Sequence, residues 1–171
     1  MPPLIELPSQ DEMLRAVGRG IQAFANVEVA VGFLFADLME PADRGGSIIA
    51  LDAAGPFATK TRMLDALAKH RLSAGVFKTF SATLKQCDDV RIFRNILAHW
   101  TVGYWPGAAT VEEAKRQKVV LAPPPSSPKW GPTIWGDEPP IHLNQIEEFI
   151  QKCQALFADL LALSNTIKSA P

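Results

Sequence analysis

The chain has 171 residues, of which 47% are hydrophobic and 20% are charged, a balance typical of one globular domain with its own core. The formal net charge of -1 at pH 7 excludes an overall field that would draw the protein to nucleic acid or anionic lipid, so binding to either needs a local patch. The N-terminal residues MPPLIELPSQ lack the basic and apolar regions of a signal peptide, and the most apolar run, VEVAVGFLFADLM, is too short to span a bilayer. We therefore expect a cytoplasmic protein that does not enter the membrane.

The first predicted helix begins after Ser9 and ends before Pro41. Ser9 offers a hydroxyl cap, and acidic residues follow it in the first turn. Apolar residues at alternating three- and four-residue steps predict its buried face. This stripe consists of Leu14, Val17, Ile21, Phe24, Val31, Phe35 and Leu38. Glu28 falls where the next core residue should be, so it needs either a buried partner, with an arginine as the obvious candidate, or local exposure of the stripe.

The first helix also contains a pair of glycines, and three further helices are predicted after it. Two glycines in the first helix, Gly18 and Gly20, indicate a place where another helix packs closely. The segment SIIALDAAG predicts a short helix that ends at Gly55, and PFATKTRMLDALAKHRL predicts a second one with proline in its first turn. The inward residues of this second helix are expected to be Phe57, Met63, Leu64 and Leu67. The stretch from Ala74 to Trp100 predicts one long helix.

The region from about residue 103 to 142 has a different composition from the rest of the chain. It holds most of the prolines and three of the four tryptophans, so it cannot be helical throughout. It is expected to form a Pro/Trp-rich loop or a small β-hairpin, in which KVVLA pairs with TIW. Connections of this length tend either to carry function or to cover another part of the protein.

The last predicted helix has the most regular pattern. It follows His142, with Gln145 placed for a capping box and with Ile141 and Ile146 placed for a hydrophobic staple. Its apolar seam has the spacing of a left-handed bundle. The seam residues are Ile146, Ile150, Cys153, Phe157, Leu160, Ser164 and Ile167. The sequence therefore predicts one all-α domain over residues 1–171, an up-and-down bundle of four to five helices.

The two cysteines, Cys87 and Cys153, lie on separate predicted helices and lack the spacing of metal-binding motifs. We expect reduced thiols that pack as small hydrophobic residues, and we expect no metal and no cofactor.

A polar stripe marks the end of the long helix, in the segment DDVRIFRNILAHW. At about 100° per residue, Asp88, Arg91, Asn95 and His99 fall within an arc of roughly 80°, and Arg94 lies about 60° further round. Guanidinium, amide and imidazole groups can together hold a phosphodiester and move protons beside it. Three simpler interpretations remain open. The stripe is a solvated face, Arg91 only forms a surface ion pair with Asp88, or the motif is a structural hydrogen-bonded clasp between helices.

The segment RNILAH, from Arg94 to His99, resembles the R-x4–6-H signature of the HEPN superfamily (higher eukaryotes and prokaryotes nucleotide-binding). In that signature the residue after the arginine is commonly polar, as Asn95 is here. The wording RN-x-x-AH followed by an aromatic residue is also similar to small bacterial all-helical proteins. The resemblance extends to the expected all-α bundle with the motif on a late core helix.

The resemblance implies a metal-independent endoribonuclease in which two protomers face one another across a shared cleft. Arg94 would hold the scissile phosphate, His99 would transfer protons, and Asn95 would orient one of them. Glu28, Asp88 and Arg91 are the candidate supporting residues. The expected partners are a second copy of the chain, RNA, and an antitoxin or other protein of a defence or toxin–antitoxin system.

The sequence also departs from part of this family. Toxin members that pair with a nucleotidyltransferase antitoxin carry a tyrosine two residues after the histidine, where this chain has Thr101, and its only tyrosine is Tyr104. Many domains of the superfamily have lost catalysis. The alternative is therefore a non-catalytic homodimeric helical module that binds a protein or a nucleotide.

Overall fold

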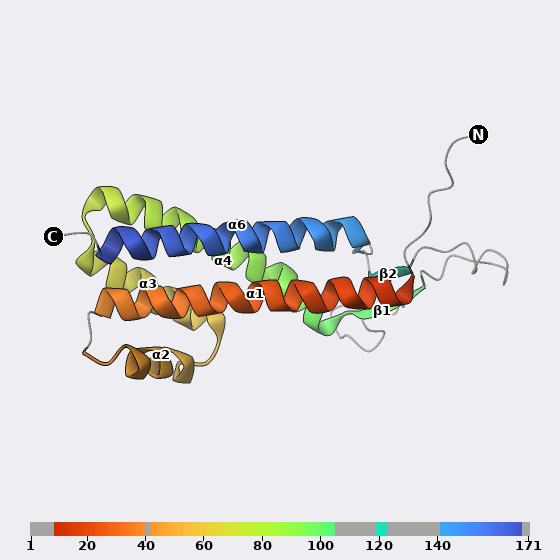
Figure 1. Cartoon of the computed structure of the whole chain (residues 1–171), viewed down its shortest axis with the longest axis horizontal. Helices are drawn as coiled ribbons and strands as arrows, with labels where there is room; N and C mark the ends of the chain where they lie inside the picture. Colours follow the sequence, from red (N-terminus) through yellow and green to blue (C-terminus); the bar gives the residue numbers. More distant parts are fainter. Residues whose placement is uncertain (1–8, 40–41, 105–118, 123–140, 169–171) are drawn as a thin grey trace, which may run out of the picture. The chain divides into compact units, whose positions relative to one another are not determined.

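The computed structural model describes residues 9–39, 42–104, 119–122 and 141–168 (Figure 1). Over these residues the chain forms an all-α helical bundle with one small antiparallel hairpin before the last helix, as the sequence predicts. The helices are α1 (Gln10–Met39), α2 (Arg44–Ala53), α3 (Phe57–Arg71), α4 (Ala74–His99) and α6 (Leu143–Lys168), and the strands are β1 (Thr101–Tyr104) and β2 (Val119–Ala122).

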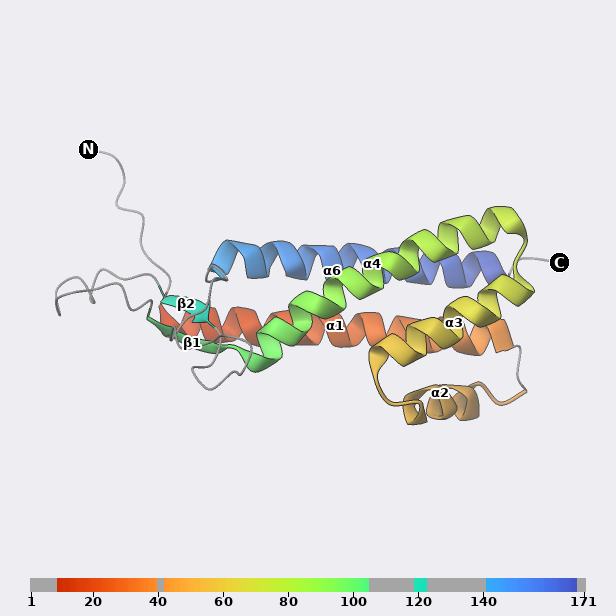
Figure 2. The same ribbon diagram turned by 180° about the vertical axis from the view of Figure 1, so that it is seen from behind.

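The chain divides into two compact units. One unit comprises Met1–Ile21 and Arg94–Ile150, and the other comprises Gln22–Phe93 and Gln151–Pro171. In the second unit, α2 lies beside the C-terminal part of α1 in both views of the ribbon (Figures 1 and 2). Gly32 on α1 faces α2, because a Cβ atom there would make an ordinary van der Waals contact, at 3.6 Å, with a methyl carbon of Ile48.

The start of α1 is fixed by a reciprocal pair of side-chain caps. The Ser9 hydroxyl accepts a hydrogen bond from the Glu12 backbone N–H at 3.2 Å, and the Glu12 carboxylate accepts one from the Ser9 backbone N–H at 2.6 Å. The predicted hydroxyl cap is thus confirmed and is one half of a capping box. The hydrogen bond from the Ser9 backbone lowers the pKa of Glu12 below its ordinary value.

The buried seam of α1 differs from the predicted stripe in its first half. Leu14 and Ile21, both expected in the core, are 49% and 37% exposed. The residues buried at three- and four-residue steps are Met13, Ala16, Gly20, Ala23, Val27, Ala30, Leu34 and Asp37. Small residues occupy most of the seam in the first half, and the larger residues Leu14 and Ile21 lie outside it. The predicted core residues Phe24, Val31, Phe35 and Leu38 are buried as expected.

By length and composition, α1 is the one described helix that could cross a membrane. α1 continues over 30 residues and so extends beyond the apolar run VEVAVGFLFADLM. In the structure, 61% of the most apolar stretch of α1 is buried, as is typical of a core helix. This stretch is therefore only weak evidence for a membrane-spanning segment.

Gly20 marks a close contact within the first unit, whereas Gly18 does not. A Cβ atom on Gly20 would lie 2.7 Å from Leu97 Cδ1 and 3.4 Å from Phe149 Cδ1. No heavy atom lies within 4 Å of the corresponding position on Gly18, within the part of the chain that the structure describes. The predicted close packing is confirmed for Gly20 alone.

We expect Gly20→Val to lower the free energy of unfolding by about 1–3 kcal/mol, because two extra methyl groups must displace Leu97 from a packed position. The matched variant Gly18→Val should change it by less than about 0.5 kcal/mol, because that position is exposed and valine is slightly better than glycine in a helix. Urea denaturation of both variants measures the difference. Equal effects would show that Gly20 is not a contact point.

The predicted end of the short helix at Gly55 and the proline at the start of α3 are confirmed, and an Asp43 cap that was not predicted starts α2. Asp43 caps its N-terminus, with the Asp43 carboxylate accepting a hydrogen bond from the Gly46 N–H at 2.9 Å. Gly55 adopts a φ of 81°, a conformation that favours glycine, and Pro56 precedes the first residue of α3. Of the predicted inward residues of α3, Phe57 and Leu64 are buried, Leu67 is half-buried and Met63 is 39% exposed.

The predicted strand KVVLA is confirmed for Val119–Ala122, but the partner predicted for it is not the one observed. This strand, β2, pairs antiparallel with β1, with Thr101 opposite Ala122 and Tyr104 opposite Val119. On its other side Leu121 forms an isolated bridge with Ile141. Only Trp100 separates the end of α4 from the start of β1. The predicted partner TIW, residues 133–135, lies outside the described residues.

The last helix is close to the prediction. The His142 backbone N–H donates to the Gln145 side chain at 2.8 Å, and Ile141 and Ile146 are both buried. In the predicted seam, Ile150, Cys153, Leu160 and Ser164 are also buried, whereas Phe157 and Ile167 are half-buried. Cys87 and Cys153 are buried free thiols, as expected. Burial raises the pKa of Cys87 to about 12 and that of Cys153 to about 11, so both stay protonated at neutral pH.

Candidate functional site

The three residues of the predicted motif lie on the last turns of α4. Arg94 Nη1 donates a hydrogen bond to Asn95 Oδ1 at 3.4 Å, and both side chains are half-buried. His99 is the last residue of the helix and is exposed. Within the described residues no hydrogen bond joins His99 to the other two. The structure therefore brings the guanidinium and the amide together and leaves the imidazole accessible at the helix end.

Arg94 occupies a different face of α4 from the one predicted. The buried residues of this helix are Phe80, Thr83, Leu84, Cys87, Val90 and Leu97. Their three- and four-residue steps place Arg94 on the same line, between Val90 and Leu97. Phe93 and Ile96, two large apolar residues of the same segment, are only half-buried. An arginine can occupy such a position because its methylene stem packs while the charged end reaches polar surroundings.

The candidate supporting residues belong to the other unit of the chain. Arg91 Nε donates to Asp88 Oδ1 at 3.3 Å, with side-chain exposures of 30% and 50%, so the predicted surface ion pair is confirmed. Such pairs contribute at most about 1 kcal/mol. Glu28 is half-buried, and no ion pair or hydrogen bond reaches it within the described residues. Of the two alternatives for Glu28, local exposure is therefore the one that the structure favours.

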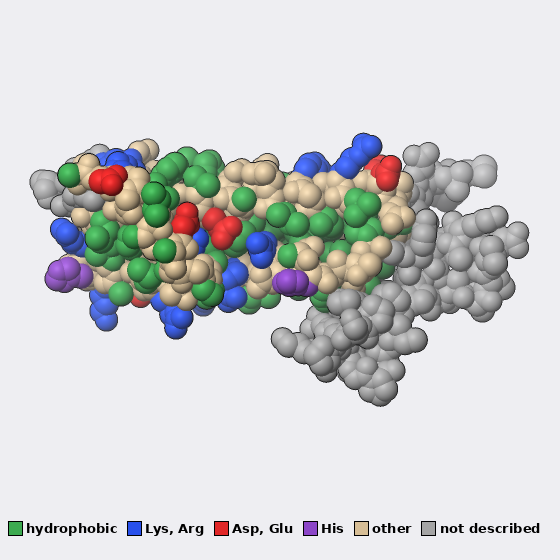
Figure 3. Space-filling model, turned by 90° about the horizontal axis from the view of Figure 1, so that it is seen from below, with side chains coloured by type: hydrophobic (Ala, Val, Ile, Leu, Met, Phe, Trp, Pro, Cys, Tyr) green, Lys and Arg blue, Asp and Glu red, His purple; other side chains and the backbone are tan. Residues whose placement is uncertain are grey.

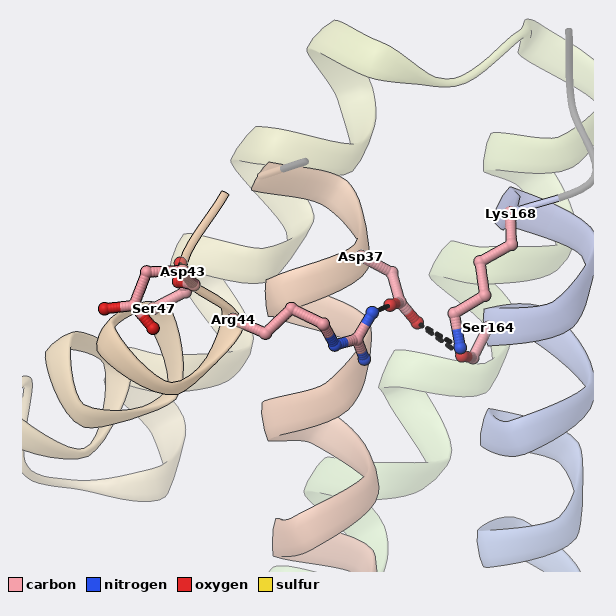
Figure 4. Close-up of polar contacts among 6 residues, drawn as sticks. All are labelled: Asp37, Asp43, Arg44, Ser47, Ser164 and Lys168. Atoms are coloured by element: carbon pink, nitrogen blue, oxygen red, sulfur yellow. Dashed lines mark hydrogen bonds and ion pairs between the residues drawn. The ribbon is translucent and has the colours of Figure 1, made fainter. Parts of the chain in front are cut away.

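The buried carboxylate of α1 is Asp37, which is not among the residues predicted for the site. Its side chain is 0% exposed and contacts three polar groups from two other helices (Figure 4). Asp37 Oδ1 accepts a hydrogen bond from Arg44 Nη1 on α2, and Oδ2 accepts one from the Ser164 hydroxyl on α6. Lys168 Nζ lies 3.4 Å from Oδ2. We call these four residues the Asp37 cluster.

The sequence contained a signal for this cluster. Asp37 falls three residues after Leu34, at the next step of the true seam of α1, and Ser164 falls in the predicted seam of α6. Two polar residues in the seams of two helices indicate a buried hydrogen bond between them. The predicted stripe of α1 was one residue out of register in its first half, and so it pointed to Glu28 instead.

In the described part of the chain, no group of three or more His, Cys, Asp or Glu side chains could hold a metal ion. The chain matches no protein-family model, no curated protein sequence and no solved structure. The likeness to the HEPN superfamily therefore depends on the motif at Arg94–His99 and on the helical bundle.

Proposed function

We propose that this protein is a HEPN-like, metal-independent endoribonuclease whose active site contains Arg94, Asn95 and His99. The observation that carries the proposal is the hydrogen bond from Arg94 to Asn95 beside an exposed His99 on the last turns of one helix. The asparagine side chain accepts a hydrogen bond from the guanidinium, and the positive charge of the guanidinium can attract a phosphate through charge-assisted hydrogen bonding. The exposed imidazole is free to approach the ribose of the same nucleotide.

The reaction would be an internal transfer of the phosphodiester. The His99 imidazole of one copy takes the proton from the 2′-hydroxyl, and the 2′ oxygen forms a bond to phosphorus. The bond from phosphorus to the 5′ oxygen breaks, and this oxygen takes a proton from the imidazolium of the second copy. The guanidinium of Arg94 stabilises the negative charge that develops on the phosphoryl oxygens. The products are a 2′,3′-cyclic phosphate and a free 5′-hydroxyl.

Exposed apolar side chains support the proposed homodimer. Figure 3 shows one face on which hydrophobic side chains gather between separate charged groups. The large apolar residues that are exposed are Leu14, Ile21, Val29, Phe33, Met39, Ile49, Met63 and Ile92. Exposed apolar side chains of this size can contribute to a protein–protein contact. We place the protein in the cytoplasm, in a defence or toxin–antitoxin system with an antitoxin or other protein as a further partner.

A second candidate function is a non-catalytic homodimeric module that binds a protein or a nucleotide. The position of Arg94 on the buried line of α4 favours it, because a half-buried arginine can serve as a structural link between helices. The formal net charge of -1 is also compatible with a partner other than RNA.

We expect the wild-type protein to cleave single-stranded RNA in the presence of EDTA and His99→Ala to be at least about 100-fold slower, because general acid–base groups contribute this much or more. The matched control is His70→Ala, which removes an exposed histidine from the last turn of α3. Gel analysis and end-group mapping of the products measure both rate and chemistry.

Cleavage that EDTA abolishes would contradict the proposed mechanism. Equal rates for His99→Ala and the wild type would remove His99 from the site, and products with 3′-hydroxyl ends would exclude attack by the 2′ oxygen.

A further inference from the structure

The Asp37 cluster borders a pocket in the second unit of the chain. The pocket has a volume of about 310 Å³. Its lining residues are Phe33, Arg44, Leu161, Ser164, Asn165 and Lys168. One wall therefore comes from successive turns of α6, and the others come from α1 and the start of α2. None of these residues belongs to the motif at the end of α4.

The charges around this pocket are not balanced. Arg44 and Lys168 both contact the single carboxylate of Asp37, so one positive charge remains among these residues. The carboxylate is fully buried, whereas the side chains of Arg44 and Lys168 are 47% and 49% exposed. Figure 4 shows both cations reaching toward Asp37 from opposite sides. The buried anion thus holds two cations at the pocket with part of each open to solvent.

The remaining donors suit an anion. A guanidinium has five N–H donors and an ammonium has three; Arg44 donates one hydrogen bond to Asp37, and Lys168 forms an ion pair with it. Asn165 also lines the pocket. Phe33, at 37% exposure, and the half-buried Leu161 supply an apolar surface next to these donors. Ligand sites typically combine such an apolar wall with a few convergent polar groups.

We propose that this pocket binds a small organic anion, a carboxylate or a phosphate monoester with an apolar or aromatic body. Arg44 and Lys168 bind the anionic group, and Phe33 and Leu161 contact the apolar body. Asp37 is a positioning residue, because it fixes both cations without lining the pocket. This binding is separate from the ribonuclease proposal and does not depend on it.

The test is a titration of ¹⁵N-labelled full-length protein with benzoate and, separately, with phenyl phosphate, followed by NMR. We expect saturable shifts of the backbone amide signals of Ser164 and Asn165 with at least one of these two compounds. The compound that binds with the higher affinity identifies the class of anion, carboxylate or phosphate monoester. Benzyl alcohol, which keeps the ring without the charge, should bind at least about tenfold more weakly, because charge-assisted hydrogen bonds carry the recognition.

Variants separate this pocket from general binding to cations. Lys168→Gln should lower the affinity for the anion about tenfold. Lys152 is an exposed lysine elsewhere on α6, and Lys152→Gln should leave the affinity unchanged. The side chain of Phe33 is partly exposed. Phe33→Ala should lower the affinity for the aromatic anion several-fold and leave the affinity for inorganic phosphate unchanged. The proposal is overturned if neither anion gives a saturable shift up to about 20 mM. Equal binding of benzyl alcohol, or an unchanged affinity in both Lys168→Gln and Phe33→Ala, would also overturn it.

Discussion

Removing both cations from the Asp37 cluster should lower the free energy of unfolding by about 3–5 kcal/mol, the range typical for a buried charge that loses its partners. The variant is Arg44→Met with Lys168→Met, which keeps the length of both side chains. Among the residues that the structure describes, it leaves the fully buried carboxylate of Asp37 with the Ser164 hydroxyl as its one remaining polar partner. Adding Asp37→Asn should restore most of the loss, because the amide keeps the shape and removes the charge. Urea denaturation measures all three proteins.

The matched control for this cycle is Arg19→Met. Arg19 forms an ion pair with Glu147, but the two side chains are 60% and 38% exposed. Its replacement should therefore change the free energy of unfolding by less than about 1 kcal/mol. If Asp37→Asn fails to restore the stability of the doubly substituted protein, the loss comes from the packing of the two side chains rather than from the buried charge.

The second large effect concerns Arg94. Arg94→Met should slow RNA cleavage at least about 100-fold, because a positioned group that stabilises transition-state charge contributes this much. The free energy of unfolding should change by less than about 1.5 kcal/mol, because methionine can fill the position of the arginine stem on the buried line of α4. Single-turnover cleavage and urea denaturation of the same preparation give both values.

This pair of values separates the two candidate functions. A loss of more than about 3 kcal/mol, together with an absence of cleavage by the wild type, would identify Arg94 as a structural link between helices. The non-catalytic module would then be the better account of the motif.

The elements with the strongest patterns were predictable from sequence. The seam of α6 keeps apolar residues on one line over several turns, so most of its buried residues were identified in advance. Caps at Ser9 and Gln145 were predictable because they depend on residues only three positions apart. The partner of β2 was not predictable from sequence, because strand pairing depends on contacts between distant segments, which composition does not encode.

The polar residues in the interior were harder to assign. On α1, large apolar residues occur on both the buried and the exposed face, as Leu14 and Ile21 show, so the true seam through Asp37 was not distinguishable by size. On α4, Phe93 and Ile96 lie close to Arg94 in sequence but off the buried line of the helix, and both are half-buried. An arginine in a seam and an arginine on a solvated face then have similar neighbours in sequence, and only packing distinguishes them.

RNA cleavage by mixtures of wild-type protein and His99→Ala protein tests the shared ribonuclease site most directly. With a ninefold excess of the variant, nearly every wild-type chain pairs with a variant chain, so activity per wild-type chain should fall to about a tenth if both imidazoles act in one symmetric site. Activity that stays proportional to the amount of wild-type chain, or no cleavage by the wild type alone, would contradict the proposal.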